Sequence, residues 1–223
     1  MLRIAHRGAS FEAPENTLAA IRRAIELGAA WVEVDVQVCA DGLVVIHDES
    51  LERTTDGHGP VASQALAALR ALDAGDGERI PLPQELLDLC RGRCGLNLEL
   101  KGPGVAPRLL PLLRDALAGG WPAGDLLASS FDWAQLATLR AALPNLPLGV
   151  LAEQVDEQTC AAARAVQASV IGCARDHVDA AAVTAAYGAG CRLWVFTVNT
   201  ADEAARLAAL GVDGVFTDRL QTV

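Results

Sequence analysis

The sequence contains no cluster rich in lysine or arginine, and acidic side chains outnumber basic ones. Its 223 residues include 28 Asp and Glu but only 18 Lys and Arg, which gives a formal net charge of −10 at pH 7. Proteins bind the nucleic-acid backbone through a surface rich in lysine and arginine. The composition therefore argues against a nucleic-acid partner.

Long apolar runs are also missing. No stretch reaches the roughly 18 uninterrupted apolar residues that a membrane-spanning helix needs. The first ten residues, MLRIAHRGAS, contain no apolar signal core. On these grounds we expect a soluble cytoplasmic protein that does not insert into a membrane.

Cysteine pairs with C-x-x-C spacing are absent as well. The six cysteines lie in apolar surroundings, and an even count would also suit disulfides in a secreted protein. For a chain of this size in the expected compartment, buried reduced thiols are the favoured interpretation, and none is predicted to be a nucleophile. The positions are Cys39, Cys90, Cys94, Cys160, Cys173 and Cys191.

What the sequence does contain is a regular alternation of predicted helices and strands from residue 84 onward. The predicted strands cover residues 2–6, 31–38, 43–46, 96–101, 126–131, 148–151, 170–174, 193–198 and 214–217. Such units predict a parallel sheet covered by helices. With 52% hydrophobic residues, the chain can bury a core large enough for one α/β domain, a TIM (β/α)8 barrel over residues 1–223. An open doubly wound sheet is the alternative, but no G-x-G-x-x-G turn supports it.

Two segments interrupt this rhythm. Nine strands are one too many for the barrel, and no helix separates residues 31–38 from residues 43–46. Residues 43–46 are therefore either a hairpin return or a third barrel strand without its helix. Residues 51–83, with a predicted helical piece at 63–72, form an insertion after this hairpin. A lid and a structural brace both remain open as its role.

Residues 32–48 (VEVDVQVCADGLVVIHD) contain a dense group of side chains with catalytic potential. Alternation along the predicted strand directs Glu33 and Asp35 to one face. A third acid, Glu99, lies in a later strand, and the carboxyl ends of barrel strands form one rim where active sites lie. Oxygen donors without a thiolate or an imidazole favour Mg²⁺ or Ca²⁺ over Zn²⁺. We therefore expect one divalent cation, Mg²⁺ or Ca²⁺.

A turn at residues 41–42 (Asp-Gly) is predicted to fold the chain back on this strand, because such turns need the positive φ that glycine accepts. In the expected register Val36 lies opposite His47, and Asp35 lies opposite Asp48. The hairpin therefore returns an imidazole to the end of the strand that carries the carboxylates.

Two imidazoles and two cationic side chains are expected at the same rim. His6 and Arg7 end the first predicted strand, His47 ends the hairpin, and Lys101 follows Glu99. Histidine titrates near neutral pH, so the pair can serve as general base and general acid. Arg7 and Lys101 suit a phosphate anion. With a Lewis-acid metal these groups describe metal-assisted cleavage of a phosphodiester.

Each of these residues also has a structural interpretation. A histidine at a strand end often only satisfies a hydrogen bond, and Glu33 and Asp35 could be exposed charges on an edge strand. Arg7 could be a salt-bridge partner, and Lys101 could only neutralise Glu99. The joint occurrence of these side chains at successive strand ends favours the catalytic interpretation.

The sequence resembles the glycerophosphodiester phosphodiesterases, and looks closest to the compact bacterial cytoplasmic type. The matching stretches run through nearly the whole chain. They are IAHRGA (4–9), APENTLAAI (13–21), VEVDVQVCADGLVVIHDESLERTTDGHG (32–59), IPLPQELL (80–87), LNLELK (96–101), SSF (129–131), FTVN (196–199) and GVDGVFTD (211–218). The His-Arg, Glu-x-Asp, His-Asp and Glu-x-Lys elements in this order make the resemblance highly specific.

The resemblance implies a TIM barrel that hydrolyses glycerophosphodiesters, the deacylated phospholipid headgroups, to sn-glycerol 3-phosphate and an alcohol. It also implies a role for each motif: a metal site at Glu33, Asp35 and Glu99, an acid–base pair at His6 and His47, and phosphate contacts at Arg7 and Lys101. In such families a neighbouring substrate hydroxyl can attack phosphorus first, giving a cyclic phosphate that water then opens.

The sequence departs from the family pattern in two places. Residues 74–81 are short where relatives often carry a longer loop with an aromatic residue, which leaves the headgroup preference open. Phe196 stands where relatives often have Trp, so we expect a weaker stacking contact with substrate from this candidate. A lipid-cleaving relative and a catalytically silent barrel that binds a phosphorylated ligand are the competing interpretations. The sequence does not determine the oligomeric state.

Overall fold

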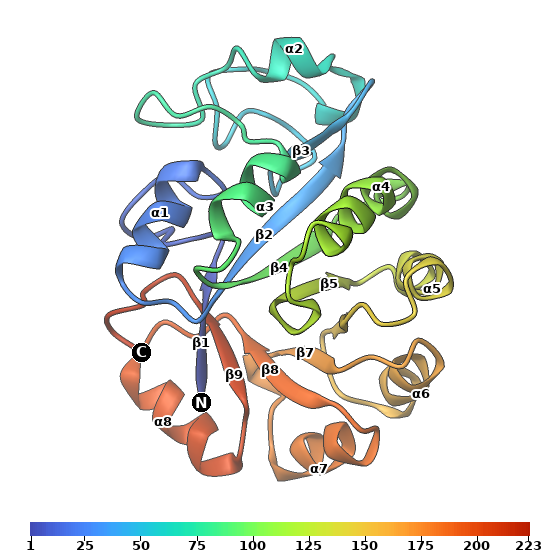
Figure 1. Ribbon diagram of the computed structural model, residues 1–223. Coiled ribbons are helices and arrows are strands. Elements are labelled where there is room, and N and C mark those ends of the chain that lie inside the picture. Colours follow the sequence, from blue (N-terminus) through green and yellow to red (C-terminus); the bar gives the residue numbers. More distant parts are fainter.

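A computed structural model describes residues 1–223, and its strands form a closed barrel (Figure 1). The strands are β1 (Leu2–His6), β2 (Trp31–Val38), β3 (Leu43–Val45), β4 (Gly95–Leu100), β5 (Leu126–Ser130), β6 (Leu148–Ala152), β7 (Val170–Ala174), β8 (Arg192–Phe196) and β9 (Gly214–Thr217). The sheet runs β1-β9-β8-β7-β6-β5-β4-β2, and parallel pairing of β1 with β2 closes the ring. The predicted TIM barrel is confirmed, and the doubly wound alternative is wrong.

The main helices pack around the outside of the barrel (Figure 1). They are α1 (Leu18–Glu26), α3 (Pro83–Cys90), α4 (Val105–Ala118), α5 (Trp133–Ala142), α6 (Glu157–Ala165), α7 (Ala180–Gly188) and α8 (Ala201–Leu210). Polar side chains that accept a bond from the first turn fix several helix starts: Thr17, Asp132, Asp156, Asp179 and Thr200. No helix is both long and apolar enough to cross a membrane.

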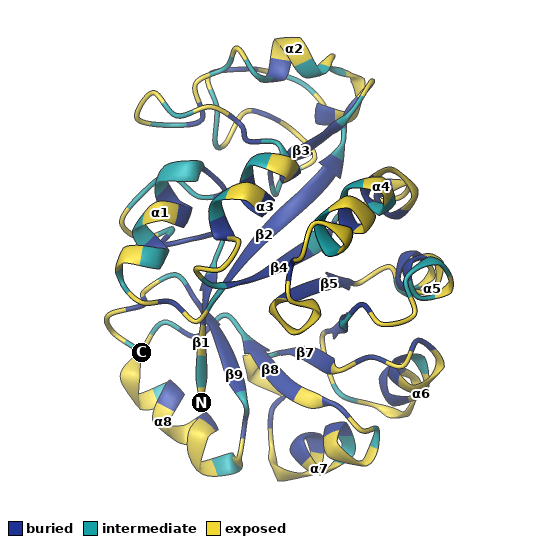
Figure 2. Cartoon of the chain, in the orientation of Figure 1, coloured by how far each residue is buried: buried dark blue, intermediate teal, exposed yellow.

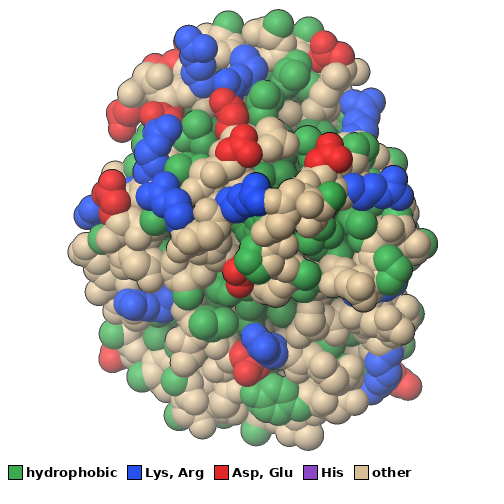
Figure 3. Space-filling model, in the orientation of Figure 1, with side chains coloured by type: hydrophobic (Ala, Val, Ile, Leu, Met, Phe, Trp, Pro, Cys, Tyr) green, Lys and Arg blue, Asp and Glu red, His purple; other side chains and the backbone are tan.

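The helices turn buried faces to the barrel and exposed faces outward (Figure 2). Their buried side chains and the outward residues of the strands form a hydrophobic core of 45 buried residues. On the face shown in Figure 3, charged side chains of both signs are scattered instead of forming a patch of one charge.

Alternation along β2 separates this core from the barrel interior. Val32, Val34 and Val36 belong to the core under the helices, so the residues between them point into the barrel. Glu33 and Asp35 are among these inward residues and are each 1% exposed. The predicted face of the strand is therefore correct, and these acids are not exposed charges on an edge strand.

An aromatic floor fills the barrel below these acids. Trp31 and Trp194 meet edge to face, with ring centroids 5.4 Å apart, and Trp194 meets Phe216 in the same manner at 5.8 Å. Gly95 lies beside Trp31, where a Cβ would come within 2.4 Å of the indole ring. A glycine at this position is therefore what lets the indole fill the barrel.

The segment 43–46 is a hairpin return, because β3 pairs antiparallel with β2 outside the ring of eight parallel strands. Val36 pairs with Val45, so the predicted pairing of Val36 with His47 is wrong by two residues. The predicted pairing of Asp35 with Asp48 is wrong for the same reason, since the backbone of Asp35 accepts a hydrogen bond from residue 46.

The turn takes four residues, 39–42, instead of the expected two. Cys39 is fully buried in a small core under the insertion, and its backbone N–H donates to the Gly42 carbonyl at 3.0 Å. Gly42 does not have the positive φ on which the prediction relied. Burial of Cys39 against the insertion therefore determines where the hairpin turns.

The insertion between β3 and α3 has its own core. It contains a 3-10 turn, η1 (Val61–Ser63), and a short helix, α2 (Leu66–Leu69). The helix predicted over 63–72 is therefore mostly wrong, because Gln64 is extended and α2 begins where Asp41 caps the Leu66 N–H at 2.7 Å. Eight buried residues hold the segment together: Cys39, Val44, Ile46, Leu51, Val61, Leu69, Ala74 and Ile80.

Candidate active site

Three carboxylates meet at the carboxyl end of the barrel. Strand register places Glu33 beside His6 of β1, and Asp35 beside Glu99 of β4. One oxygen from each acid lies within 4.8 Å of the others. The three acids predicted from the sequence therefore form one cluster.

The positive charges around the cluster do not fully compensate its three carboxylates. Glu33 Oε1 is buried without a hydrogen-bond partner, and Glu33 Oε2 accepts the backbone N–H of Arg7 at 3.0 Å. Burial, followed by repulsion from Asp35 and Glu99, raises the pKa of Glu33 well above its ordinary value. Burial and then Asp35 also raise the pKa of Glu99. Three close carboxylates with an orphaned oxygen are a donor set that fits a hard divalent cation.

Arg7 and Lys101 flank the acids. Arg7 Nε lies 3.3 Å from Asp35 Oδ2, and Lys101 Nζ lies 2.6 Å from Glu99 Oε1 and 3.4 Å from Asp35 Oδ1. Burial opposes both charges, but the neighbouring carboxylates outweigh it, with Asp35 the strongest, and raise the pKa of each side chain. Both groups therefore stay cationic and are available to an anion in the cavity.

The backbone of Arg7 is left-handed, with φ of 57°, a conformation that non-glycine residues rarely adopt. It turns the Arg7 N–H toward Glu33. Gly8 follows with φ of 82°, and a Cβ there would lie 2.7 Å from the backbone of Ala20 in α1. The loop after β1 is therefore folded tightly between the site and α1.

His6 has a carboxylate partner far away in the sequence. Its Nδ1 lies 2.7 Å from Asp218 Oδ1, which follows β9. Asp218 also accepts hydrogen bonds from Ser10 Oγ at 3.1 Å and Asn199 Nδ2 at 2.7 Å. Burial opposes its charge, but these bonds, with His6 the strongest, lower the pKa of Asp218 to about 2. Asp218 is therefore an ionised acceptor that fixes the imidazole.

His47 is held in a similar way by its neighbour. Its Nδ1 lies 2.6 Å from Asp48 Oδ1. Gln37 Nε2 donates to the carbonyls of His47 and Asp48, each at 2.7 Å, which fixes the backbone of this turn. Burial lowers the pKa of His47, although Asp35 and Asp48 act in the opposite direction. With Nδ1 engaged, Nε2 is the nitrogen left for proton transfer.

A cavity of about 220 Å³ joins these groups. One side of it is polar and the other is aromatic, where Phe131 and Phe196 meet edge to face at 5.8 Å. The lining residues are His6, Arg7, Glu33, His47, Glu99, Lys101, Phe131, Leu151, Phe196, Thr197 and Phe216. Phe196 is thus in the cavity wall, as a residue that contacts substrate would have to be. Asp35 does not line the cavity but clusters with Glu33 and Glu99, which do.

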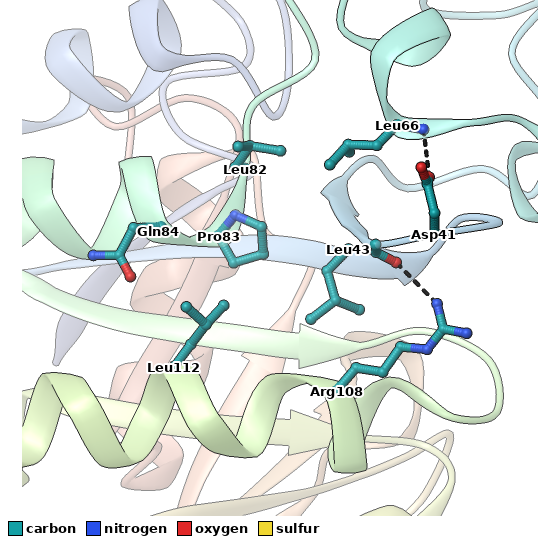
Figure 4. A pocket seen from close by; sticks show the side chains of 9 residues that line it. Asp41, Leu43, Leu66, Leu82, Pro83, Gln84, Arg108 and Leu112 are labelled. Carbon is teal, nitrogen blue, oxygen red and sulfur yellow. Dashed lines mark hydrogen bonds between the residues drawn. The ribbon is translucent and has the colours of Figure 1, made fainter.

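A larger cavity of about 510 Å³ lies outside the barrel, between the hairpin turn, the insertion, α3 and α4 (Figure 4). Its charged side chains form hydrogen bonds with backbone groups. Asp41 accepts the Leu66 N–H, and Arg108 Nη1 donates to the carbonyls of Cys39 and Gly42. It contains neither a histidine nor a carboxylate cluster. The smaller cavity is therefore the candidate active site.

Several residues at the site were not assigned a role from the sequence. Asn16 donates to Asp35 Oδ2 at 2.8 Å and accepts the Asp35 N–H at 3.1 Å. Glu15, Arg53 and Asp218 complete the polar surroundings. Asn16 has φ of 59°, which asparagine tolerates better than most residues. These residues lie in the stretches APEN (13–16), ERTT (52–55) and FTD (216–218). Nothing in the local pattern of these stretches indicated which side chains the residues would contact.

The chain is similar in sequence and structure to known proteins of one family. The model of the glycerophosphoryl diester phosphodiesterase family matches residues 6–222. A glycerophosphodiester phosphodiesterase of Caldanaerobacter subterraneus is 34% identical, and the alignment covers 99% of this chain and 95% of that protein. One from Bacillus subtilis is 32% identical, with 98% and 83% covered. The solved structure of an Oleispira antarctica phosphodiesterase in complex with the product sn-glycerol-3-phosphate superposes with a TM-score of 0.91 at 34% identity, over 99% of this chain and 94% of that one.

Proposed function

The chain is an enzyme of the glycerophosphoryl diester phosphodiesterase family, and on that basis we propose that it hydrolyses glycerophosphodiesters to sn-glycerol 3-phosphate and an alcohol. One observation carries the proposal. Glu33, Asp35 and Glu99 converge within 4.8 Å, and Glu33 and Glu99 line a cavity that also presents two histidines, an arginine and a lysine. The Oleispira structure supports it, since that phosphodiesterase was solved in complex with the product sn-glycerol-3-phosphate.

Glu33, Asp35 and Glu99 would hold one divalent cation. Carboxylate oxygens without sulfur or nitrogen donors suit Mg²⁺ or Ca²⁺. A bound cation supplies Lewis-acid polarisation of a phosphoryl oxygen. Arg7 and Lys101 add fixed positive charge for the remaining phosphate oxygens.

His6 and His47 would divide the proton transfers. The attacking hydroxyl must lose a proton and the leaving alcohol must gain one, and imidazoles are suited to both steps near neutral pH. Asp218 and Asp48 accept from the two Nδ1 positions, which leaves Nε2 of each ring for the substrate. Because burial lowers the pKa of His47, its neutral form is favoured, and we assign it the role of first base.

A panel of substrates tests the proposal. Purified protein is given glycerophosphocholine, glycerophosphoethanolamine, lysophospholipid or phospholipid vesicles, with Mg²⁺, Ca²⁺ or chelator, and release of sn-glycerol 3-phosphate is measured. We expect turnover of the deacylated diesters with a divalent cation, no turnover with chelator, and loss of activity in Glu33→Gln. Activity on the acylated lipids alone would favour a lipid-cleaving enzyme. Tight substrate binding without turnover under any cation would favour a silent phosphate-binding barrel.

A further inference from the structure

A chain of alternating charges runs from the candidate active site into the insertion. Arg7 Nη1 donates to Glu15 Oε1 at 2.8 Å. On the other side of Glu15, Arg53 Nη1 donates to Oε2 at 2.7 Å and Arg53 Nη2 donates to Oε1 at 2.8 Å. Arg53 belongs to the insertion, while Arg7 and Glu15 belong to the barrel loop after β1. The insertion is thus linked to a candidate phosphate-binding residue.

The same guanidinium also holds the carboxylate behind His47. Arg53 Nη2 donates to Asp48 Oδ1 at 2.9 Å, and Arg53 Nε donates to Asp48 Oδ2. These bonds are the leading cause that lowers the pKa of Asp48. Asp48 in turn engages His47 Nδ1 at 2.6 Å. One side chain therefore fixes two carboxylates, one behind His47 and one behind Arg7.

Only arginine can make this arrangement. Its planar guanidinium presents five N–H donors in a rigid fork and can grip a carboxylate along each of two edges. Four of the five N–H groups are accounted for by Glu15 and Asp48. A lysine ammonium at this position is a point charge that cannot grip both carboxylates in bidentate fashion.

The backbone that carries Arg53 is held by the core of the insertion. Leu51 is 2% exposed and belongs to that core, and its carbonyl accepts both the N–H and the Oγ of Thr55. Ser50 and Pro60 form an isolated antiparallel bridge at the base of the loop. The Arg53 side chain, although 47% exposed, therefore projects from a fixed loop.

We propose that Arg53 is a positioning residue: through Asp48 it orients the His47 imidazole, through Glu15 it holds Arg7, and the insertion thereby braces the active site from outside the barrel. The inference rests on the proposed function, because it concerns residues assigned to that reaction. Arg53 itself does not line the cavity, so its effect on turnover must pass through the residues it holds.

Kinetics of Arg53→Ala and Arg53→Lys form the first part of the test. We expect kcat on a glycerophosphodiester to fall by about 10- to 100-fold in both variants, as when partners that orient active-site ligands are removed, with a smaller change in KM. Guanidinium ion at millimolar concentration should restore part of the kcat of Arg53→Ala and should not change Arg53→Lys. Arg23→Ala is the matched control, because Arg23 is 40% exposed and bridges Glu12 and Glu26 on the surface. It should retain wild-type kinetics.

The second part is independent of activity. Nitrogen-15 NMR of the imidazoles, assigned with a His47 variant, should show the His47 Nδ1–H bonded to Asp48 in the wild type and the loss of that signature in Arg53→Lys and Arg53→Ala. If the wild type turns over no glycerophosphodiester, the proposed function fails. The NMR comparison still shows whether Arg53 orients the His47 imidazole through Asp48. A kcat within about twofold of wild type in folded Arg53→Lys, or an unchanged His47 spectrum, would overturn the inference. If Arg53→Ala does not fold, Arg53→Lys alone carries both readouts.

Discussion

Replacing Glu33 by glutamine should make the metal-free protein more stable while removing its response to a divalent cation. Glu33 is fully buried between Asp35 and Glu99, and its Oε1 has no partner. Glutamine has nearly the same shape but no charge. Its amide oxygen can still accept the Arg7 N–H that now reaches Oε2. The substitution therefore removes repulsion without opening a cavity.

The expected gain in stability follows from the distances between the carboxylates of the cluster. At the 4.8 Å within which the carboxylate oxygens lie, Coulomb's law at an effective dielectric constant of about 20 gives about 3.5 kcal/mol of repulsion for each ionised pair. Attraction to the Arg7 and Lys101 cations cancels much of this repulsion. We expect a net gain of about 1–3 kcal/mol at pH 8, which in a domain of this size raises Tm by about 3–10 °C.

Thermal unfolding at pH 8 provides the measurement, first with chelator and then with increasing Mg²⁺. With chelator, Glu33→Gln should melt above the wild type. Saturating Mg²⁺ should stabilise the wild type, by about 2.7 kcal/mol at a hundredfold excess over Kd, and should leave the variant nearly unchanged. Glu153→Gln in the exposed loop after β6 is a control with the same change of charge, and it should alter neither Tm nor the Mg²⁺ response.

Two results would refute the reasoning. If Glu33→Gln melts below the wild type in chelator, the three acids do not repel one another as their distances imply. If the variant keeps the full Mg²⁺ stabilisation, the cation binds elsewhere, and the proposed metal site loses its support.

Three further predictions follow from the same site. In the metal-free protein, Tm should fall as pH rises above about 4.5. Glu33 and Glu99 have raised pKa values, so the folded state keeps protons that the unfolded state releases. A Tm that does not change with pH in the presence of chelator would contradict this prediction. Asp218→Asn should lower kcat by about 100-fold with an unchanged near-UV spectrum, because the amide no longer fixes His6; equal kcat would show that this contact is only structural. Lys101→Met should lower kcat/KM by about 10- to 100-fold, the loss of a charged hydrogen bond of about 1.5–3 kcal/mol, and a change below twofold would remove Lys101 from phosphate binding.

The barrel and the carboxylate cluster could be predicted because both depend on local patterns. Alternation of valines with Glu33 and Asp35 requires only that one face of β2 meets helices and the other meets the interior. The position of Glu99 follows from the same alternation in β4, and parallel register then brings it beside Asp35. Each step uses neighbours within a few residues and one general rule about barrel rims.

The carboxylate that holds His6 and the arginine that holds Asp48 and Glu15 could not be predicted, because long-range packing brings them together. Asp218 lies 212 residues from His6 along the chain, and the parallel pairing of β1 with β9 is what brings them together. Arg53 reaches Glu15 across 38 residues, through an insertion whose fold depends on its own small core. No periodicity in either stretch indicates which side chains will meet.

The hairpin register alone does not place His47 at the cavity. The turn at 39–42 shifts β3 by two residues relative to the expected pairing, and side-chain direction repeats every two residues along a strand. A shift of two leaves the faces of the returning strand unchanged, and Val45, which pairs with Val36, lies in the core under the helices. Alternation continued from Val45 would turn residue 47 toward that core. Because β3 ends at Val45, alternation no longer sets the direction of His47, and its imidazole lines the cavity. Gln37 fixes its backbone and Asp48 fixes its ring, so the precision of this histidine comes from the residues that the local pattern could not assign.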